Sequence, residues 1–161
     1  MAAPAPEHVR NIVLVGQDGA GKTSLAEAML FVSGKTPRMG TTHDGKSYLD
    51  YDPEEIKRKG SVSSTVAPFA WGSTKINLID TPGLFDFEGG MYEGMIAAES
   101  VLITVSARDG VEVGTEKAYD LADRLGRAKM FFVTQMDMEN ADFYKALEQL
   151  KAQFGPSVCP L

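Results

Sequence analysis

Short apolar runs alternate along this chain with segments in which apolar residues recur at helical spacing. The apolar runs predict strands, because the strands of a parallel sheet are buried on both faces and lack a polar side. Two of these runs, residues 66–71 and 75–80, flank the turn Gly72-Ser73-Thr74 and predict an antiparallel hairpin. The other predicted strands cover about residues 10–15, 101–105 and 129–133. This alternation predicts an α/β fold: a mostly parallel sheet with one antiparallel strand, helices on both faces, and ligands at the carboxyl ends of the strands.

Capping residues mark the ends of the predicted helices. The first helix is expected to end near Val32, with Gly34 just beyond it. A later helix is expected to begin at Thr115 and to be closed by Gly126. The last predicted helix covers about residues 141–154. The helix over about residues 91–99 has Met91, Met95, Ile96 and Ala98 as its apolar set, and its methionines are expected to lie in the core rather than in a partner groove.

Two segments lack any such pattern. Residues 1–8 predict a flexible N-terminal arm. Residues 35–59 predict a long loop, and loops of that length inside a compact domain usually carry function. Within it, His43 is expected to be solvated rather than to serve as a ligand or base. The basic triplet 57–59 predicts a solvated face, with contact to a phosphate or an RNA partner as the alternative.

Composition limits the possible classes of protein. The 161 residues, 43% of them hydrophobic, suffice for one domain with a substantial core. A formal net charge of −6 argues against a nucleic-acid groove, which needs a basic face. The single cysteine, Cys159, excludes an intrachain disulfide, and two histidines do not suggest a zinc site. No signal peptide or membrane-spanning run is recognisable, so we expect a cytoplasmic protein without membrane attachment.

The segment from Gly16 to Thr23 has the spacing of a phosphate-binding loop between a strand and a helix. Its glycines allow the backbone N–H groups to point at a triphosphate, and the start of the next helix favours the same ligand. Lys22 would contact the β- and γ-phosphates, and the Thr23 hydroxyl would bind Mg²⁺. An ordinary glycine turn is the alternative, which the flanking strand and helix disfavour. The residues expected to bind nucleotide here are Gly16, Gln17, Asp18, Gly19, Ala20, Gly21, Lys22, Thr23 and Ser24.

Two further strand ends carry candidate site residues. Asp80 would serve Mg²⁺ through a water molecule, and the N–H group of Gly83 would approach the γ-phosphate. A simple turn is the alternative reading of this Asp-Thr-Pro-Gly segment. Asp137 would accept hydrogen bonds from N1–H and the 2-amino group of guanine, a donor pair that adenine lacks. Capping of the next turn is the alternative role for Asp137. GTP or GDP with Mg²⁺ is therefore the expected ligand.

These motifs resemble the N-terminal GTP-binding part of elongation factor G, and more specifically of its elongation-factor-G-like paralogues, almost end to end. The resemblance implies one GTP-binding domain over residues 1–161, with a switch I-like loop at 35–61 and a switch II-like segment at 83–90. It also implies that the full-length protein acts on the ribosome. By alignment, Ser61 takes the place of the switch I threonine that joins Mg²⁺ and the γ-phosphate, with Ser63 as the alternative. The resemblance rests on the phosphate-binding loop with Ser24-Leu25 and on Val9-Arg10-Asn11-Ile12, Asp50-Tyr51-Asp52, 76–83, Asp86-Phe87, 110–117, Phe132-Val133 and Met136-Asp137.

The chain departs from the family pattern at four places. Leu84 occupies the position of the histidine that orients the attacking water, and leucine can form no hydrogen bond there. Thr134-Gln135-Met136-Asp137 replaces Asn-Lys-Met-Asp and resembles the Thr-Gln-x-Asp of some Rho-type GTPases. By that resemblance Thr134, Gln135 and Asp137 recognise the base, with altered affinity. Gly19 occupies the position of the P-loop aspartate of translational GTPases. The chain also stops before the last guanine-contacting loop, the closing strand and helix and the later domains, so it is expected to be a fragment.

The sequence therefore predicts a GTPase domain of the translation-factor class, which converts GTP to GDP and phosphate as a switch read by the ribosome. One alternative is a GTP-dependent ribosome-binding module whose hydrolysis is impaired by Leu84. The other is a P-loop kinase that acts on a nucleotide or small molecule. Asp80 and Asp137 disfavour the kinase.

Overall fold

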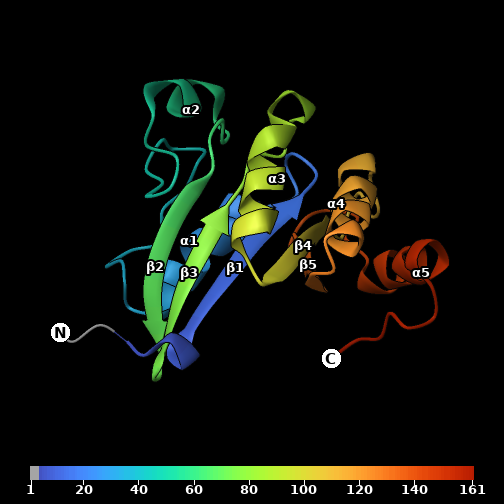
Figure 1. The fold of residues 1–161 in the computed structure, drawn as a ribbon. Helices are drawn as coiled ribbons and strands as arrows, with labels where there is room; N and C mark the ends of the chain where they lie inside the picture. Colours follow the sequence, from blue (N-terminus) through green and yellow to red (C-terminus); the bar gives the residue numbers. More distant parts are fainter. Residues whose placement is uncertain (1–3) are drawn as a thin grey trace.

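The computed structural model describes residues 4–161 and contains a five-stranded sheet in the order β2-β3-β1-β4-β5 (Figure 1). The strands are β1 (Val9–Gly16), β2 (Thr65–Trp71), β3 (Thr74–Asp80), β4 (Ser100–Ser106) and β5 (Ala128–Thr134). The α-helices are α1 (Lys22–Val32), α2 (Pro53–Arg58), α3 (Glu88–Ala97), α4 (Val113–Arg124) and α5 (Phe143–Phe154). Two 3₁₀ turns, η1 (Pro6–His8) and η2 (Phe85–Phe87), precede β1 and α3.

The central strand β1 pairs in parallel with β3 on one side and β4 on the other, and β5 extends the sheet in parallel beyond β4. Only β2 is antiparallel, and it pairs with β3 through a hairpin closed by the pair Trp71 and Thr74. The hairpin turn is thus Gly72-Ser73, because Thr74 already belongs to β3. The predicted mostly parallel sheet with one antiparallel strand is confirmed. As a result, the carboxyl ends of four strands meet at one edge.

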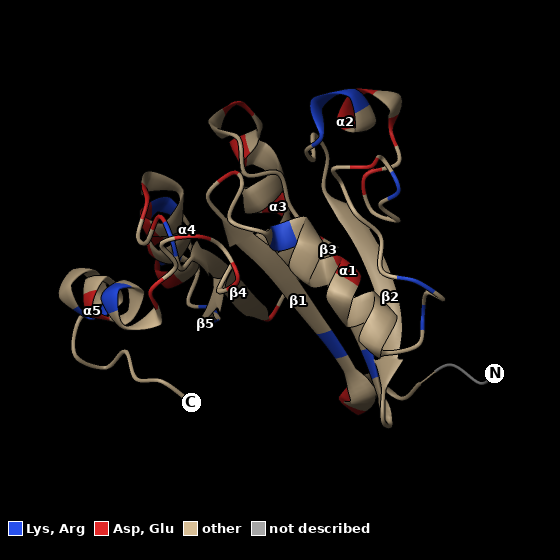
Figure 2. Cartoon of the chain, turned by 180° about the vertical axis from the view of Figure 1, so that it is seen from behind, with Lys and Arg blue, Asp and Glu red and all other residues tan. Residues whose placement is uncertain are grey.

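Helices cover both faces of this sheet. Figure 1 shows α3 and α4 in front of it, and Figure 2 shows α1 crossing the opposite face. Successive strand side chains point to opposite faces, so Val13 and Val15 pack on the side of α3 and α4 while Leu14 packs on the side of α1. All three side chains are fully buried. This double burial explains why the β1 sequence reads as a continuous apolar run.

The expectation of an unstructured segment over residues 35–59 was wrong for Pro53–Arg58, which form α2. Asp52 caps this helix by accepting a hydrogen bond from the N–H of Glu54 at 2.8 Å. Glu55 completes a capping box by accepting from the N–H of Asp52 at 3.3 Å. Proline at the first helical position is compatible with a helix start, because its missing N–H would have no partner there. The capping box and the proline that mark the start of α2 can both be read from the sequence.

Other element boundaries shift by a few residues. Thr115 does not begin α4; it lies inside the first turn, where its hydroxyl accepts from the N–H of Glu112 at 3.4 Å. Asp142 caps α5. In α3, Met95 is fully buried and Met91 packs against the core, as expected for the methionines, whereas Ile96 is half exposed.

The predicted N-terminal arm is described only in part. Its first three residues lie outside the described residues, and Pro6–His8 form the turn η1. Among the helices of the described chain, none has the length and apolar character needed to cross a membrane.

Candidate nucleotide-binding site

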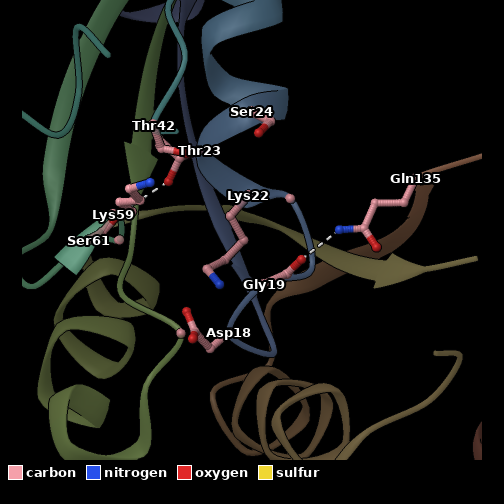
Figure 3. Close-up of a pocket in the computed structure, with 12 residues that line it drawn as sticks. Asp18, Gly19, Lys22, Thr23, Ser24, Thr42, Lys59, Ser61 and Gln135 are labelled. Carbon is pink, nitrogen blue, oxygen red and sulfur yellow. Dashed lines mark hydrogen bonds between the residues drawn. The ribbon is translucent and has the colours of Figure 1, made fainter. Parts of the chain in front are cut away.

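A pocket of about 210 Å³ opens at the carboxyl edge of the sheet, beside the loop between β1 and α1 (Figure 3). It is enclosed by that loop, by the segment before β2, by Gly83 after β3, and by Gln135 after β5. Segments far apart in the sequence thus converge on the loop that the GxxxxGK[ST] spacing identified. The residues that line it are Asp18, Gly19, Gly21, Lys22, Thr23, Ser24, Thr42, Lys59, Gly60, Ser61, Gly83 and Gln135.

The loop curls because Gly21 adopts a φ of +79° immediately before α1, a conformation that residues with a Cβ rarely adopt. The N–H group of Ala20 donates to the carbonyl of Gln17 at 3.2 Å. Two side chains at the end of β5 and just beyond it hold the outer part of the loop. Thr134 Oγ1 donates to Ala20 O at 2.8 Å, and Gln135 Nε2 donates to Gly19 O at 2.7 Å.

Lys22 lies almost completely buried under the loop, with 6% of its surface exposed. Its Nζ donates to Gly16 O at 3.2 Å and to Gln17 O at 2.8 Å. Burial lowers the pKa of Lys22, while the nearby carboxylates, Asp80 foremost, act in the opposite direction. A cation held inside a ring of backbone groups, beside a helix N-terminus, is the arrangement that binds phosphate.

Hydroxyl and carboxylate groups meet at one side of the pocket. Thr23 Oγ1 donates to Asp80 Oδ2 at 2.7 Å and lies 3.1 Å from Ser61 Oγ. Ser61 Oγ donates to Asp50 Oδ1 at 2.7 Å. Among the described residues, the second oxygens of both carboxylates, Asp80 Oδ1 and Asp50 Oδ2, are buried without a hydrogen-bond partner. Unpartnered buried carboxylate oxygens beside two hydroxyls fit the oxygen-only ligand preference of Mg²⁺ and its bound water.

Burial is the main reason why the pKa of Asp80 rises to about 7. The hydrogen bond from Thr23 and the charge of Lys22 oppose that rise. Burial also raises the pKa of Asp50. Burial therefore disfavours the charged form of both carboxyls, and a bound cation would stabilise that form.

We expect Asp80→Asn to stabilise the chain in the absence of nucleotide and Mg²⁺. The folded chain retains a proton on Asp80 that the unfolded chain releases near its ordinary pKa of about 3.9, so stability falls as the pH rises from about 4 towards 7. Removing the charge should raise the free energy of unfolding by about 2–4 kcal/mol at pH 8 and by less than half of that at pH 5. Urea unfolding at both pH values measures the difference, with the exposed Asp137→Asn as control. If the substitution raised the free energy of unfolding no more at pH 8 than at pH 5, the raised pKa of Asp80 would not be the cause.

The turn after β3 brings Gly83 against the phosphate-binding loop. A Cβ at Gly83 would lie 2.7 Å from the Cα of Asp18, so only glycine allows this approach. The next residue, Leu84, is 37% exposed and lies in a separate small crevice with Gly16 and Phe85, outside the pocket. The start of the switch II-like segment therefore presents an apolar side chain.

The residues expected to read the base lie at the end of β5. Thr134 and Gln135 contact the phosphate-binding loop, as described above. Asp137 is exposed in the following turn and does not line the pocket. Gln135 has a φ of +58°, and its Oε1 is buried without a partner among the described residues. The role of Asp137 as base reader therefore stays a prediction.

The structure also places the other candidates from the sequence. The side chain of His43 is 84% exposed and pairs with Asp44, so the expectation of a solvated histidine is confirmed. Ser63 does not line the pocket, and its N–H donates to Glu55 Oε1 at 3.1 Å. Gln17 Oε1 accepts from the N–H of Gly114 at 2.8 Å, which ties the loop to α4.

Sequence reasoning did not single out Thr42 and Gly60, which line the pocket, or Asp50, which holds Ser61. Lys59 also lines the pocket, and phosphate contact was the alternative given for its basic triplet. Asp50 belonged to a motif that carried the family resemblance, but nothing local indicated its partner.

Residues 7–158 match the family described as the elongation factor Tu GTP-binding domain. The chain belongs to this family. It is 36% identical to an elongation factor G-like protein of Mycobacterium tuberculosis over 159 residues, which are 99% of the chain and 22% of that protein. An elongation factor G-like protein of Thermotoga maritima is also 36% identical, over 96% of the chain and 22% of its own length. The resemblance to elongation-factor-G-like proteins is thereby confirmed.

Solved structures share this fold. A crystal structure of a Thermus thermophilus protein superposes with a TM-score of 0.89 at 40% identity, over 92% of this chain and 22% of the other. A bacterial selenocysteine-specific elongation factor shares the fold with a TM-score of 0.73 at 23% identity, over 89% of this chain and 23% of its own. The chain thus spans about a fifth of the length of the relatives it matches.

Proposed function

We propose that this chain is the GTP- and Mg²⁺-binding domain of a cytoplasmic elongation-factor-G-like protein, which hydrolyses GTP to GDP and phosphate as a switch read by the ribosome. The observation that carries the proposal is the convergence of Lys22, Thr23 and Asp80 beneath the phosphate-binding loop. Membership of a GTP-binding family supports guanine as the base. The ribosome is proposed as partner because the relatives are named as elongation factors.

Within this proposal, each residue has a defined task. Lys22 neutralises the β- and γ-phosphates, and the N–H groups of the loop and of Gly83 hold their oxygens. Thr23 and Ser61 would hold Mg²⁺ through their hydroxyls, and Asp80 would do so through water. Mg²⁺ held by these residues would supply positive charge that offsets the charge of the phosphates. The net charge of −6 is compatible with this ligand, because the contacts that favour phosphate are local.

The second candidate is a GTP-dependent ribosome-binding module with impaired hydrolysis. The specific observation in its favour is Leu84, whose side chain lies outside the pocket and offers no hydrogen bond to a water molecule. No histidine lines the pocket among the described residues, and the side chain of His43 is mostly in solvent. A single-turnover GTP assay with and without ribosomes distinguishes the two candidates, because only the first predicts phosphate release.

The binding proposal is tested by displacing a fluorescent GDP analogue with GTP, GDP and ATP, with and without Mg²⁺. We expect GDP and GTP to displace the analogue at far lower concentrations than ATP, and Mg²⁺ to strengthen binding of both guanine nucleotides. Equal displacement by ATP and GTP would favour the kinase alternative instead.

Asp137→Asn is expected to relax selectivity for guanine. The carboxylate can accept from two guanine donors, whereas the amide offers one acceptor and one mismatched donor. Xanthine has an oxygen acceptor in place of the 2-amino group. The ratio of the affinity for xanthosine diphosphate to the affinity for GDP should therefore rise by about tenfold or more. Competition of GDP and xanthosine diphosphate against the fluorescent analogue measures the ratio. An unchanged ratio in the variant would show that Asp137 does not read the base.

A further inference from the structure

One buried carboxylate on α1 belongs to none of the groups assigned to the nucleotide. Glu27 lies one helical turn after Thr23 and is completely inaccessible to solvent. Among the described residues, no cation lies within ion-pair distance of it. A carboxylate buried in this way is costly unless hydrogen-bond donors surround it, so its partners indicate its purpose.

All the donors to Glu27 come from one stretch of the switch I-like loop. The N–H of Gly40 donates to Oε2 at 3.1 Å. Ser47 Oγ donates to Oε1 at 2.6 Å, and so do the N–H groups of Tyr48 at 2.5 Å and Leu49 at 3.2 Å. A single side chain of α1 therefore closes the stretch 40–49 of this loop by binding both ends of that stretch.

These contacts continue to the Mg²⁺ side of the pocket. Ser47 Oγ, which donates to Glu27, accepts from the N–H of Asp50 at 3.0 Å. Asp50 in turn accepts from Ser61, which lies 3.1 Å from Thr23 (Figure 3). The series of hydrogen bonds leaves α1 at Glu27 and returns to α1 at Thr23, so these contacts hold the loop against the Mg²⁺ side of the pocket.

We propose that Glu27 is a positioning residue that pre-orders the switch I-like loop over the site and thereby sets the preference for GTP over GDP. The inference rests on the proposed function. In GTPases the γ-phosphate and its metal order switch I, and ordering a loop at the moment of binding costs conformational entropy. A loop that is already in place removes part of that cost. GDP lacks the γ-phosphate and gains nothing from the ordered loop, so the benefit falls on GTP alone.

The test is Glu27→Gln, which keeps the size of the side chain but replaces one acceptor by an NH₂ donor that faces N–H groups. Affinities of the 161-residue chain for GTP and GDP are compared at saturating Mg²⁺. We expect the GTP-to-GDP affinity ratio to fall by about fivefold or more, which is the lower end of typical coupling between sites, while GDP affinity stays within about twofold. Hydrogen exchange without nucleotide should become faster at Gly40, whose N–H would face the new NH₂ group, and at Tyr48 and Leu49, whose acceptor loses its negative charge.

Glu54→Gln is the matched control, because Glu54 lies in the same loop, is exposed, and pairs only with Arg58. It should change neither the ratio nor the exchange. Ser47→Ala is the second variant: it leaves the carboxylate in place, removes the hydroxyl between Glu27 and Asp50, and should shift both readouts in the same direction. If Glu27→Gln does not fold, Ser47→Ala carries the test.

An unchanged nucleotide ratio in these variants would overturn the inference. A fall in the ratio without faster exchange at Tyr48 and Leu49 would also overturn it, because the effect would then not run through the loop. A wild-type chain that binds neither nucleotide contradicts the proposed function itself, and is distinguished by that control measurement from failure of the Glu27 inference.

Discussion

Replacing Lys22 with alanine is expected to weaken GDP and GTP binding by about tenfold to a hundredfold or more. Lys22 is held beneath the phosphate-binding loop, with its Nζ donating to the carbonyls of Gly16 and Gln17. Loss of a hydrogen bond to a charged group costs roughly 1.5–3 kcal/mol, and each 1.4 kcal/mol changes an affinity tenfold. Because the charge sits in a low-dielectric environment, salt should screen it poorly. Calorimetric titration of the variant with GDP and Mg²⁺ measures the loss.

Two controls make this result specific. Lys145→Ala removes an exposed lysine from α5 and should leave GDP affinity unchanged. Thermal unfolding of Lys22→Ala without nucleotide shows whether the fold survives, since the buried carbonyls lose a donor. GDP affinity near that of the wild type in a folded variant would show that the loop is not a phosphate-binding loop.

Leu84→His is expected to raise the single-turnover rate of GTP hydrolysis by at least about tenfold. The attacking water must be held in line with the γ-phosphate by a polar group at the start of switch II, and such groups contribute typically 10²–10⁴-fold. Leu84 offers no such group, and its partial exposure leaves room for an imidazole. The expected gain is below the full range because the helical turn η2, which begins at Phe85, must place the new ring.

The comparison must be made at saturating GTP and Mg²⁺, so that a change in affinity does not resemble a change in catalysis. Leu84→Ala is the matched control, because it removes the leucine without adding a polar group, and its rate should remain low. A wild-type chain that already hydrolyses GTP as fast as Leu84→His would show that another group orients the water.

The stability prediction for Asp80 and the affinity prediction for Lys22 share one physical basis. Both groups are buried, and burial favours the neutral form of each: it lowers the pKa of Lys22 and raises that of Asp80. The site is therefore destabilising for the free chain and favourable for a ligand that supplies phosphate and metal charge. Removing Asp80 should improve stability while it weakens Mg²⁺ binding, a common trade-off at functional sites.

Some features missed from the sequence were locally encoded. The helix α2 follows from the spacing of Asp52, Pro53 and Glu55, which makes a capping box with proline at the first helical position. The absence of apolar periodicity in so short a helix concealed it. Similarly, Thr115 stands inside the first turn of α4 rather than before it, because threonine serves either position and only the hydrogen bond decides.

The sequence by itself determined the five strands, four of the five α-helices, and the glycine-rich loop between β1 and α1. These depend on local chemistry: buried parallel strands require continuous apolar runs, and the curl before α1 requires glycine at Gly21. It also determined that Asp80 ends a buried strand, and hence that a carboxylate lies at the carboxyl edge of the sheet.

Only the tertiary structure decided which polar groups meet there. Glu27 binds the loop at Ser47, and Asp50 binds Ser61, across separations that no periodic pattern records. Such contacts depend on the path of an irregular segment, and that path is set by where its few buried donors find acceptors. Burial in turn set the charge states, since Asp80 has a raised pKa only because the folded chain excludes water from it.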